Sequence, residues 1–174
     1  ELRGKDLITR EQIETEISHI ESIQEVRQID LQRLRILQET SLFQSDYFIH
    51  VRNGKGGRER LSPIIGQNVD RIVERIQNTP AEGKVWQHIN TLADIHGYRA
   101  EYATAIYKAS ARKIEEIPFD KINKGSGKRY QSEVYVCRKD EVGKKLDKVA
   151  MRICSKALGH NRIEVVANNY IRGL

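Results

Sequence analysis

Two stripes of apolar residues recur near the start of the chain, at the three- and four-residue spacing of amphipathic helices. Thr9-Arg10-Glu11-Gln12 precedes the first stripe and has the form of a capping box, and Asp30 stands ahead of the second as its expected cap. Neither proline nor glycine interrupts residues 5–53, so we predict a pair of helices in this region. The stripes consist of Ile13, Ile17 and Ile20 and of Leu31, Leu34 and Leu37.

The next pattern is typical of strands. Residues 47–51 (Tyr-Phe-Ile-His-Val) and 58–63 (Arg-Glu-Arg-Leu-Ser-Pro) flank the run Asn53-Gly54-Lys55-Gly56-Gly57. Asn-Gly and Gly-Gly supply the positive φ angles that a tight hairpin turn requires. We therefore predict a β-hairpin whose flexible tip carries Lys55.

Three further helical segments are expected before residue 112. The first covers residues 68–77, and the second starts at Trp86 and breaks near His96-Gly97. The third runs from about 98 to 111 and exposes Arg99 at its start, as a helix N-terminus that faces an anion would. The inward positions of the first two segments are Val69, Ile72, Val73 and Ile76, and Trp86, Ile89 and Leu92.

Residues 118–147 form an irregular stretch rich in glycine and lysine, which we call the basic excursion. Within it, the run Val-Tyr-Val-Cys-Arg at 134–138 and the following Gly143 predict a small hairpin. A helix comes next, expected to bury Val149, Ile153 and Ala157, and a short terminal helix then carries Tyr170. The whole pattern predicts one α+β domain over residues 1–174, mostly helical, with a small antiparallel sheet.

Composition agrees with a globular protein: of 174 residues, 39% are hydrophobic and 31% are charged. Thirty Lys and Arg against 24 Asp and Glu give a net charge of +6, which favours nucleic acid or an anionic membrane as partner. No apolar run approaches the ~20 residues of a membrane span. Cys137 and Cys154 form no metal-spaced or redox pair, so we expect both to be reduced and the protein to be cytoplasmic.

Basic side chains gather at two places, where we expect contacts with DNA phosphates. A solvated basic face is an equally good interpretation of either group. We further hypothesise that the basic excursion reaches DNA or a neighbouring subunit. The candidates are Lys145, Lys148, Arg152 and Lys156 around the helix after the small hairpin, and Lys121, Lys124, Lys128 and Arg129 in the excursion.

Five short motifs are weak one by one but informative as a series. A single His-x-x-Arg, here His96-Gly97-Tyr98-Arg99, is more often structural than functional, and a lysine on a hairpin tip usually serves solubility. Their order along the chain changes the interpretation, because all five motifs would rarely occur in this order by chance. The series is Arg3 with Asp6, Lys55 on its glycine-rich turn, His96 with Arg99, Leu158-Gly159-His160, and Tyr170.

These segments resemble the catalytic domain of the tyrosine recombinases, the phage-integrase family, and most of all the integrases of integrative and conjugative elements. The resemblance covers nearly the whole chain, and its most specific parts are Gly-Lys-Gly-x-x-Glu-Arg at 54–60 and Leu-Gly-His…Tyr at 158–170. The helices at 10–40 look like an insertion, which leaves Arg33 and Arg35 as alternative candidates for the first arginine.

The resemblance implies a site-specific DNA recombinase that cleaves and rejoins strands through a 3′-phosphotyrosine intermediate. A tyrosine hydroxyl, with an ordinary pKa near ~10, needs help to attack a phosphodiester. Arg3 and Arg99 would clamp the non-bridging oxygens, with Asp6 orienting Arg3. Tyr170 would attack, and Lys55 would protonate the leaving 5′-oxygen as general acid.

His96 and His160 would hydrogen-bond the phosphate or assist proton transfer from the tyrosine. No metal, ATP or other cofactor is expected, since arginines supply the charge and the phosphotyrosine link conserves the bond energy. The implied partners are double-stranded DNA carrying attachment sites, a homo-tetramer formed on DNA by a chain that is monomeric alone, and a directionality factor, with no membrane. The family also implies the bacterial cytoplasm and a separate DNA-clamping domain, so we expect this chain to be the catalytic part alone.

Two rival functions remain open. One is a type IB topoisomerase-like enzyme that swivels DNA strands, which would relax a supercoiled plasmid lacking any attachment site. The other is a DNA-binding module of the same fold without catalysis. Binding alone does not need a terminal tyrosine, and this argues against the second rival.

Overall fold

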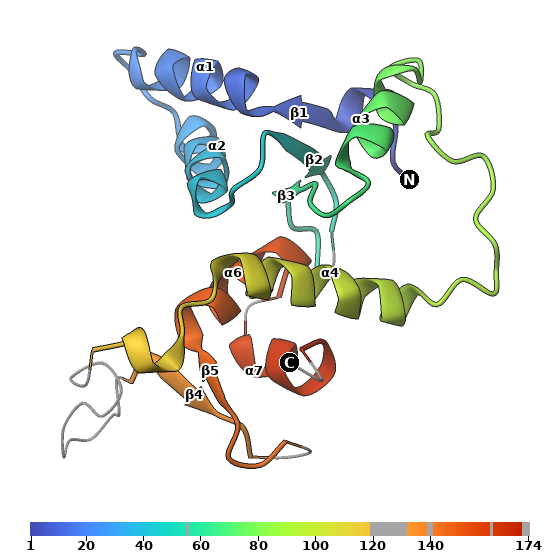
Figure 1. The fold of residues 1–174 in the computed structure, drawn as a ribbon. Coiled ribbons are helices and arrows are strands. Elements are labelled where there is room, and N and C mark those ends of the chain that lie inside the picture. Colours follow the sequence, from blue (N-terminus) through green and yellow to red (C-terminus); the bar gives the residue numbers. More distant parts are fainter. Residues whose placement is uncertain (55, 119–131, 139–140, 161, 172–174) are drawn as a thin grey trace. The chain divides into compact units, whose positions relative to one another are not determined.

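The computed structural model describes residues 1–54, 56–118, 132–138, 141–160 and 162–171 (Figure 1). They fall into two compact units, Glu1–Asp94 and Ile95–Leu174. Both helices and antiparallel sheets are present, so the predicted α+β class is confirmed. Within these described ranges, no helix combines the length and apolar character needed to cross a bilayer.

The first unit is built on a three-stranded antiparallel sheet of β1 (Leu7–Thr9), β2 (Tyr47–Val51) and β3 (Arg60–Pro63), in the order β1-β2-β3. The predicted hairpin is confirmed, with His50 opposite Leu61 across β2 and β3. Side chains alternate between buried and half-buried along both of these strands, as expected for a sheet with one covered face.

The predicted helix pair follows β1 as α1 (Arg10–Glu21) and α2 (Gln28–Gln38), which lie side by side (Figure 1). The capping box is present: Gln12 N–H donates to Thr9 Oγ1 at 3.2 Å, and Thr9 N–H donates to Gln12 Oε1 at 2.9 Å. Ile13, Ile20 and Leu37 are buried as the stripes predict. A short 3-10 turn, η2 (Glu39–Leu42), then leads towards β2.

Asp30 takes part in capping the second helix, but from within its first turn and not as the N-cap residue. Helix α2 begins at Gln28, so Asp30 lies in its first turn, where its carboxylate accepts the N–H of Arg27, the residue at the N-cap, at 3.1 Å. Of the predicted second stripe, Leu37 is fully covered, whereas Leu31 is 41% exposed.

Helix α3 (Val69–Gln77) matches the predicted segment and buries Val73 and Ile76 against Ile64 and Val85. The next prediction, a helix starting at Trp86, is wrong: residues 84–94 are not helical. Their apolar positions mimic a helical stripe, but long-range bonds fix the backbone differently.

Val85 shows how those long-range bonds act. Its N–H donates to the Leu2 carbonyl at 3.1 Å, and its carbonyl accepts Arg75 Nε at 3.0 Å. The Arg75 guanidinium also lies 5.4 Å from the centroid of the Trp86 ring. Ile89 and Leu92 are 64% and 89% exposed, so these residues do not pack against a core that would stabilise a helix here.

The second unit begins with α4 (Ile95–Ser110), which runs straight through the His96-Gly97 pair that was expected to break a helix. A 3-10 turn, η3 (Ile114–Glu116), follows it. The predicted small hairpin is confirmed as β4 (Val134–Val136) paired antiparallel with β5 (Lys145–Asp147). Residues 119–131 and 139–140 of the basic excursion lie outside the described residues.

Helices α6 (Lys148–Leu158) and α7 (Ile163–Asn169) complete the unit, with α6 packed between α4 and α7. The predicted inward stripe of α6 is right at Ala157 but off elsewhere, since Val149 and Ile153 are only half-buried. Contact with α4 decides the buried face: Met151 and Cys154 are fully covered, and the Cys154 thiol donates to the Ala103 carbonyl at 3.2 Å.

Asp147 joins three elements of this unit. Its carboxylate, fully buried, caps α6 by accepting the Val149 N–H at 2.8 Å, and its own N–H donates to the Tyr107 hydroxyl at 2.9 Å. Arg112 grips both carboxylate oxygens, with Nε and Nη2 each 2.8 Å away. This cluster fixes the start of α6 relative to the end of α4.

Candidate active site

Three of the predicted catalytic residues lie together in the second unit: Arg99, His160 and Tyr170. The His160 and Tyr170 rings are stacked, with centroids 5.4 Å apart and planes inclined by 29°. The Arg99 guanidinium carbon is 5.6 Å from the centroid of the Tyr170 ring. Arg99 Nη2 lies 3.5 Å from His160 Nε2 and donates to the Leu158 carbonyl at 3.3 Å. The tyrosine is therefore flanked by a guanidinium and an imidazole.

Gly159 explains why Leu-Gly-His places the imidazole here. It ends α6 with φ of +75°, a left-handed conformation that glycine adopts without strain. Ser155 then holds the main chain of His160 through two hydrogen bonds. The His160 N–H donates to the Ser155 carbonyl at 2.8 Å, and the His160 carbonyl accepts the Ser155 hydroxyl at 2.9 Å. The turn fixes the backbone from which the ring projects.

Tyr170 is docked against its own unit. It follows α7 directly and is 9% exposed. Its N–H donates to the Val166 carbonyl at 3.0 Å, and its carbonyl accepts the Thr104 hydroxyl of α4 at 3.4 Å. The next residue, Ile171, is fully buried and anchors the end of the described chain. Motif reasoning identified the tyrosine but gave no signal for Thr104 or Ile171.

His96 lies in the first turn of α4 and is exposed. The three-residue spacing puts it one turn before Arg99 on neighbouring positions of the helix surface. The helix thus presents both residues of the His-x-x-Arg motif along one side, which a helix break between them would have prevented.

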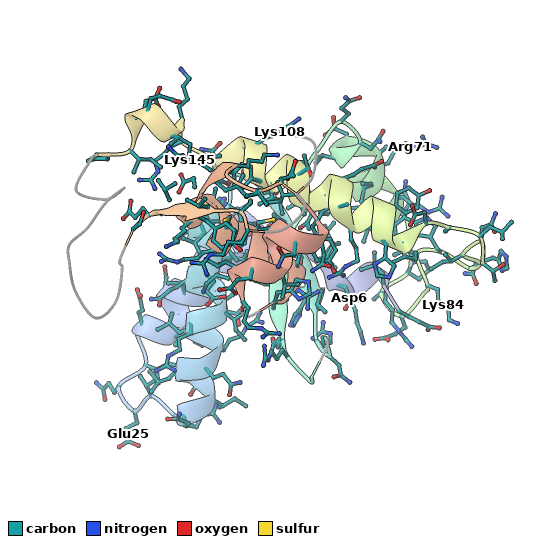
Figure 2. All side chains as sticks on the ribbon, turned by 90° about the horizontal axis from the view of Figure 1, so that it is seen from below. Asp6, Glu25, Arg71, Lys84, Lys108 and Lys145 are labelled. Atoms are coloured by element: carbon teal, nitrogen blue, oxygen red, sulfur yellow. The ribbon has the colours of Figure 1, made fainter. Side chains whose placement is uncertain are left out.

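Arg3 and Asp6, the other described candidates, belong to the first unit. Asp6, labelled in Figure 2, ends the 3-10 turn η1 (Gly4–Asp6). It is 6% exposed. Its carboxylate accepts the main-chain N–H of Arg3 at 2.8 Å and Arg52 Nε at 3.3 Å. Asp6 therefore fixes Arg3 through the backbone, and its guanidinium partner is Arg52, for which the sequence carried no signal.

The Arg3 side chain faces a carboxylate. Its Nη1 lies 3.1 Å from Glu82 Oε2, and Lys5 Nζ donates to the same carboxylate at 2.7 and 2.9 Å. The hydrogen bond from Lys5 is the main cause that lowers the pKa of Glu82, and Arg3 adds to it. Two cations thus share one exposed anion at this point.

Gly4 is required by packing. A Cβ at this position would overlap the carbonyl oxygens of Thr79 and Pro80, so the turn after α3 lies directly on the Arg3-Gly4 peptide. Gly4 N–H and Lys5 N–H donate to carbonyls of that turn, at 3.3 and 3.0 Å. The placement of Glu82 beside Arg3 follows from this docking.

The alternative first arginines lie on α2. Arg35 is exposed. Arg33 is 20% exposed and bound by two carboxylates, Glu16 and Glu59, with nitrogen–oxygen distances of 2.7 Å to each.

The candidate general acid and part of the candidate DNA surface lie outside the described residues: Lys55, Lys121, Lys124, Lys128 and Arg129. The other basic candidates are divided. Arg152 and Lys156 are exposed on α6, and Lys145 is exposed on β5. Lys148 is half-buried, donates to the Ser132 carbonyl at 2.7 Å, and has a pKa lowered by burial and by Arg152.

Within the ranges that the structure describes, no three His, Cys, Asp or Glu side chains gather in a way that could hold a metal ion. No protein-family model, curated protein or solved structure matches the chain.

Proposed function

We propose that this chain is the catalytic part of a site-specific DNA recombinase of the tyrosine-recombinase family, acting in the integration or excision of a mobile element. The observation that carries the proposal is the cluster of Arg99, His160 and Tyr170. These residues come from the start of α4, the end of α6 and the end of α7, and they meet within one unit. Packing alone does not require a guanidinium and an imidazole around a terminal tyrosine.

In the proposed reaction, the Tyr170 hydroxyl oxygen attacks the phosphorus of a DNA phosphodiester. A tyrosine–phosphorus bond forms, the bond to the 5′-oxygen breaks, and the DNA keeps a 3′-phosphotyrosine end. The phenolic proton is lost as the bond forms, and His160, whose ring stacks on that of Tyr170, is the proposed residue that assists its transfer. Arg99 stabilises the negative charge that gathers on the non-bridging oxygens.

Of the remaining proposed groups, His96 belongs to the second unit, and the first unit would supply Arg3 and Lys55. Arg3 is the proposed second clamp, and its side chain pairs with an anion, the Glu82 carboxylate that it shares with Lys5. A phosphate oxygen would take the place of that carboxylate on DNA. Lys55 is the proposed general acid that protonates the leaving 5′-oxygen, and attack by a 5′-hydroxyl from another strand reverses the step.

A covalent trapping experiment tests the proposal without knowledge of the target sequence. The protein is incubated with a pool of nicked duplexes that carry a randomised segment, and DNA that resists SDS extraction is recovered and sequenced. We expect linked DNA with the wild type and with Tyr135→Phe, and none with Tyr170→Phe. Tyr135→Phe is the matched control, because it removes a half-buried hydroxyl from the same unit on β4.

Each other outcome has a meaning. Linked DNA from Tyr170→Phe would reject Tyr170 as nucleophile, and no linked DNA from the wild type would contradict the proposal as a whole. Recovered sequences without a common motif, together with relaxation of any supercoiled plasmid, would favour the topoisomerase-like rival. DNA binding without a covalent product would favour the non-catalytic module.

A further inference from the structure

A cluster of four ionisable side chains joins α1 and α2 to the β2–β3 hairpin inside the first unit. Arg33 of α2 makes a two-pronged contact with Glu16 of α1, with Nε to Oε1 at 2.7 Å and Nη2 to Oε2 at 2.9 Å. Its third nitrogen, Nη1, donates to Glu59 Oε1 at 2.7 Å. His50 Nε2 of β2 lies 2.6 Å from the same oxygen of Glu59. We call these four residues the Arg33 brace.

The Arg33 brace is half-buried, and the side chains of Glu16 and Glu59 remain 36% and 34% exposed. The His50 side chain is 7% exposed and that of Arg33 is 20% exposed. A charge removed from water is costly unless it is paired and hydrogen-bonded, and here one guanidinium is satisfied by two carboxylates. The hydrogen bond from Arg33 is the main cause that lowers the pKa of Glu16, which keeps that carboxylate ionised. Arg33 is thus committed to the interior of the unit and is poorly placed to bind a DNA phosphate.

The Arg33 brace lies at the base of the turn between β2 and β3. Glu59 is the last residue before β3, and His50 lies on β2 opposite Leu61. The brace therefore grips both sides of the hairpin where its turn begins. Among the described residues of the turn, main-chain hydrogen bonds of 2.9 Å run from Gly54 N–H to the Arg58 carbonyl and from Gly57 N–H to the Gly54 carbonyl.

Two glycines of the turn have open space around them, whereas Gly54 at its start packs closely against Arg58 and Arg60. Gly56 and Gly57 have φ of +75° and +73°, and a Cβ at either would meet no atom within 4 Å. Glycine has the greatest backbone freedom of any residue, because it lacks a Cβ. The direction of the turn must therefore be set at its base.

We propose that Arg33 is a positioning residue: through Glu59 and His50 it fixes the direction of the 52–58 turn, so that proton delivery to the leaving 5′-oxygen depends on it. The inference rests on the proposed function, in which Lys55 of this turn is the general acid. It also gives the inserted α1–α2 pair a role, as the support on which the brace is built.

The physical half of the proposal is tested on the protein alone by amide hydrogen exchange. Arg33→Met should speed the exchange of Gly54 and Gly57 by about tenfold, because their hydrogen bonds open more often when the base of the turn is released. Arg27→Met is the matched control: it removes an arginine from the N-cap of the same helix, where the Arg27 side chain is 77% exposed and pairs with Asp30. Unchanged exchange in Arg33→Met would overturn the brace.

The catalytic half is tested with cleavable DNA recovered by covalent trapping, made in two forms. One has the natural bridging 5′-oxygen, and the other has sulfur at that position. A thiolate leaves without being protonated, because thiols are far more acidic than alcohols, so the sulfur substrate does not need a general acid. Arg33→Met should cleave the oxygen substrate at least about tenfold more slowly than the wild type, yet cleave the sulfur substrate within about twofold of it.

The remaining outcomes discriminate. Equal slowing on both substrates would reduce Arg33 to a merely structural role, and no slowing on either would reject the proposal. Arg33→Lys, which keeps the charge but not the two-pronged geometry, should fall between Arg33→Met and the wild type on the oxygen substrate. If the wild type cleaves neither substrate, the proposed function fails, and the exchange measurement alone decides whether Arg33 braces the turn.

Discussion

Arg99 and Arg112 lie near opposite ends of helix α4 and are held in opposite ways. Arg112 places two nitrogens 2.8 Å from the two oxygens of Asp147, a fully buried carboxylate. Arg99 has one nitrogen 3.3 Å from the Leu158 carbonyl and 3.5 Å from His160 Nε2. The charge of Arg112 is matched by a buried carboxylate, and breaking such a pair destabilises a fold, whereas Arg99 makes only long contacts in the same unit and is the arginine that we propose binds a DNA phosphate.

The largest effect should come from the loosely held arginine. We expect Arg99→Met to lower the rate of covalent complex formation by about 100-fold or more, because it removes a charged donor from the developing phosphate charge. Its free energy of unfolding should change by less than about 1 kcal/mol, since long contacts are weak. Single-turnover cleavage and urea denaturation measure the two quantities. A loss of stability as large as that of Arg112→Met would break the comparison.

Arg112→Met should show the reverse. It leaves Asp147 buried without its cation, which we expect to lower the free energy of unfolding by about 2 kcal/mol. The value is set below that for a fully enclosed pair, because the Arg112 side chain is 38% exposed and water screens the interaction. Urea denaturation at neutral pH measures it. The double variant Arg112→Met with Asp147→Asn should recover part of the loss, and no recovery would place the effect elsewhere.

The stability of the fold in acid should depend on the same carboxylate, that of Asp147. Burial raises the pKa of Asp147, but hydrogen bonds from Arg112 and Val149 outweigh it, so the folded pKa lies below the unfolded one. Such a group stabilises the fold above its unfolded pKa, near ~3.9, and this contribution is lost as pH falls through the folded pKa. Below about pH 5 the wild type should therefore lose stability faster than Asp147→Asn. Parallel urea midpoints for the two proteins from neutral to acid pH would contradict this.

The sequence predicted the features that depend on neighbouring residues. The capping box at Thr9 and Gln12 and the hairpin around Asn53-Gly54 formed as expected, because each is specified within a few residues. The helix predicted from Trp86 did not form, because Leu2 and Arg75 hydrogen-bond to the backbone just before it. The local spacing of apolar residues does not reveal such long-range contacts.

The candidate site divides in the same way. The order of motifs singled out Arg99, His160 and Tyr170, and the structure brings these three together. The order of motifs did not reveal that Asp6 pairs with Arg52, nor that Arg33 bridges Glu16 and Glu59. Each of these contacts joins residues far apart in the chain. Motif spacing reports which groups are present, and only tertiary contacts report what holds them.

The smallest expected effect separates backbone strain from site geometry. Gly159 and Gly143 both have positive φ, +75° and +85°. Replacing either with alanine should lower the free energy of unfolding by about 1 kcal/mol, through the strain of a left-handed conformation. Only Gly159→Ala should also slow cleavage, because the turn at Gly159 sets the His160 ring beside Tyr170. Equal cleavage rates in the two variants would show that this turn does not control the site.

Identification of the linked residue tests the central claim most directly. DNA covalently trapped by the wild-type protein is digested with nuclease and protease, and the modified peptide is sequenced by mass spectrometry. The released strand is tested for a free 5′-hydroxyl by direct labelling with polynucleotide kinase. We predict a nucleotide on Tyr170 and a 5′-end that labels without prior dephosphorylation. A nucleotide on another residue, or a 5′-end that needs dephosphorylation first, would contradict cleavage by Tyr170 through a 3′-phosphotyrosine link.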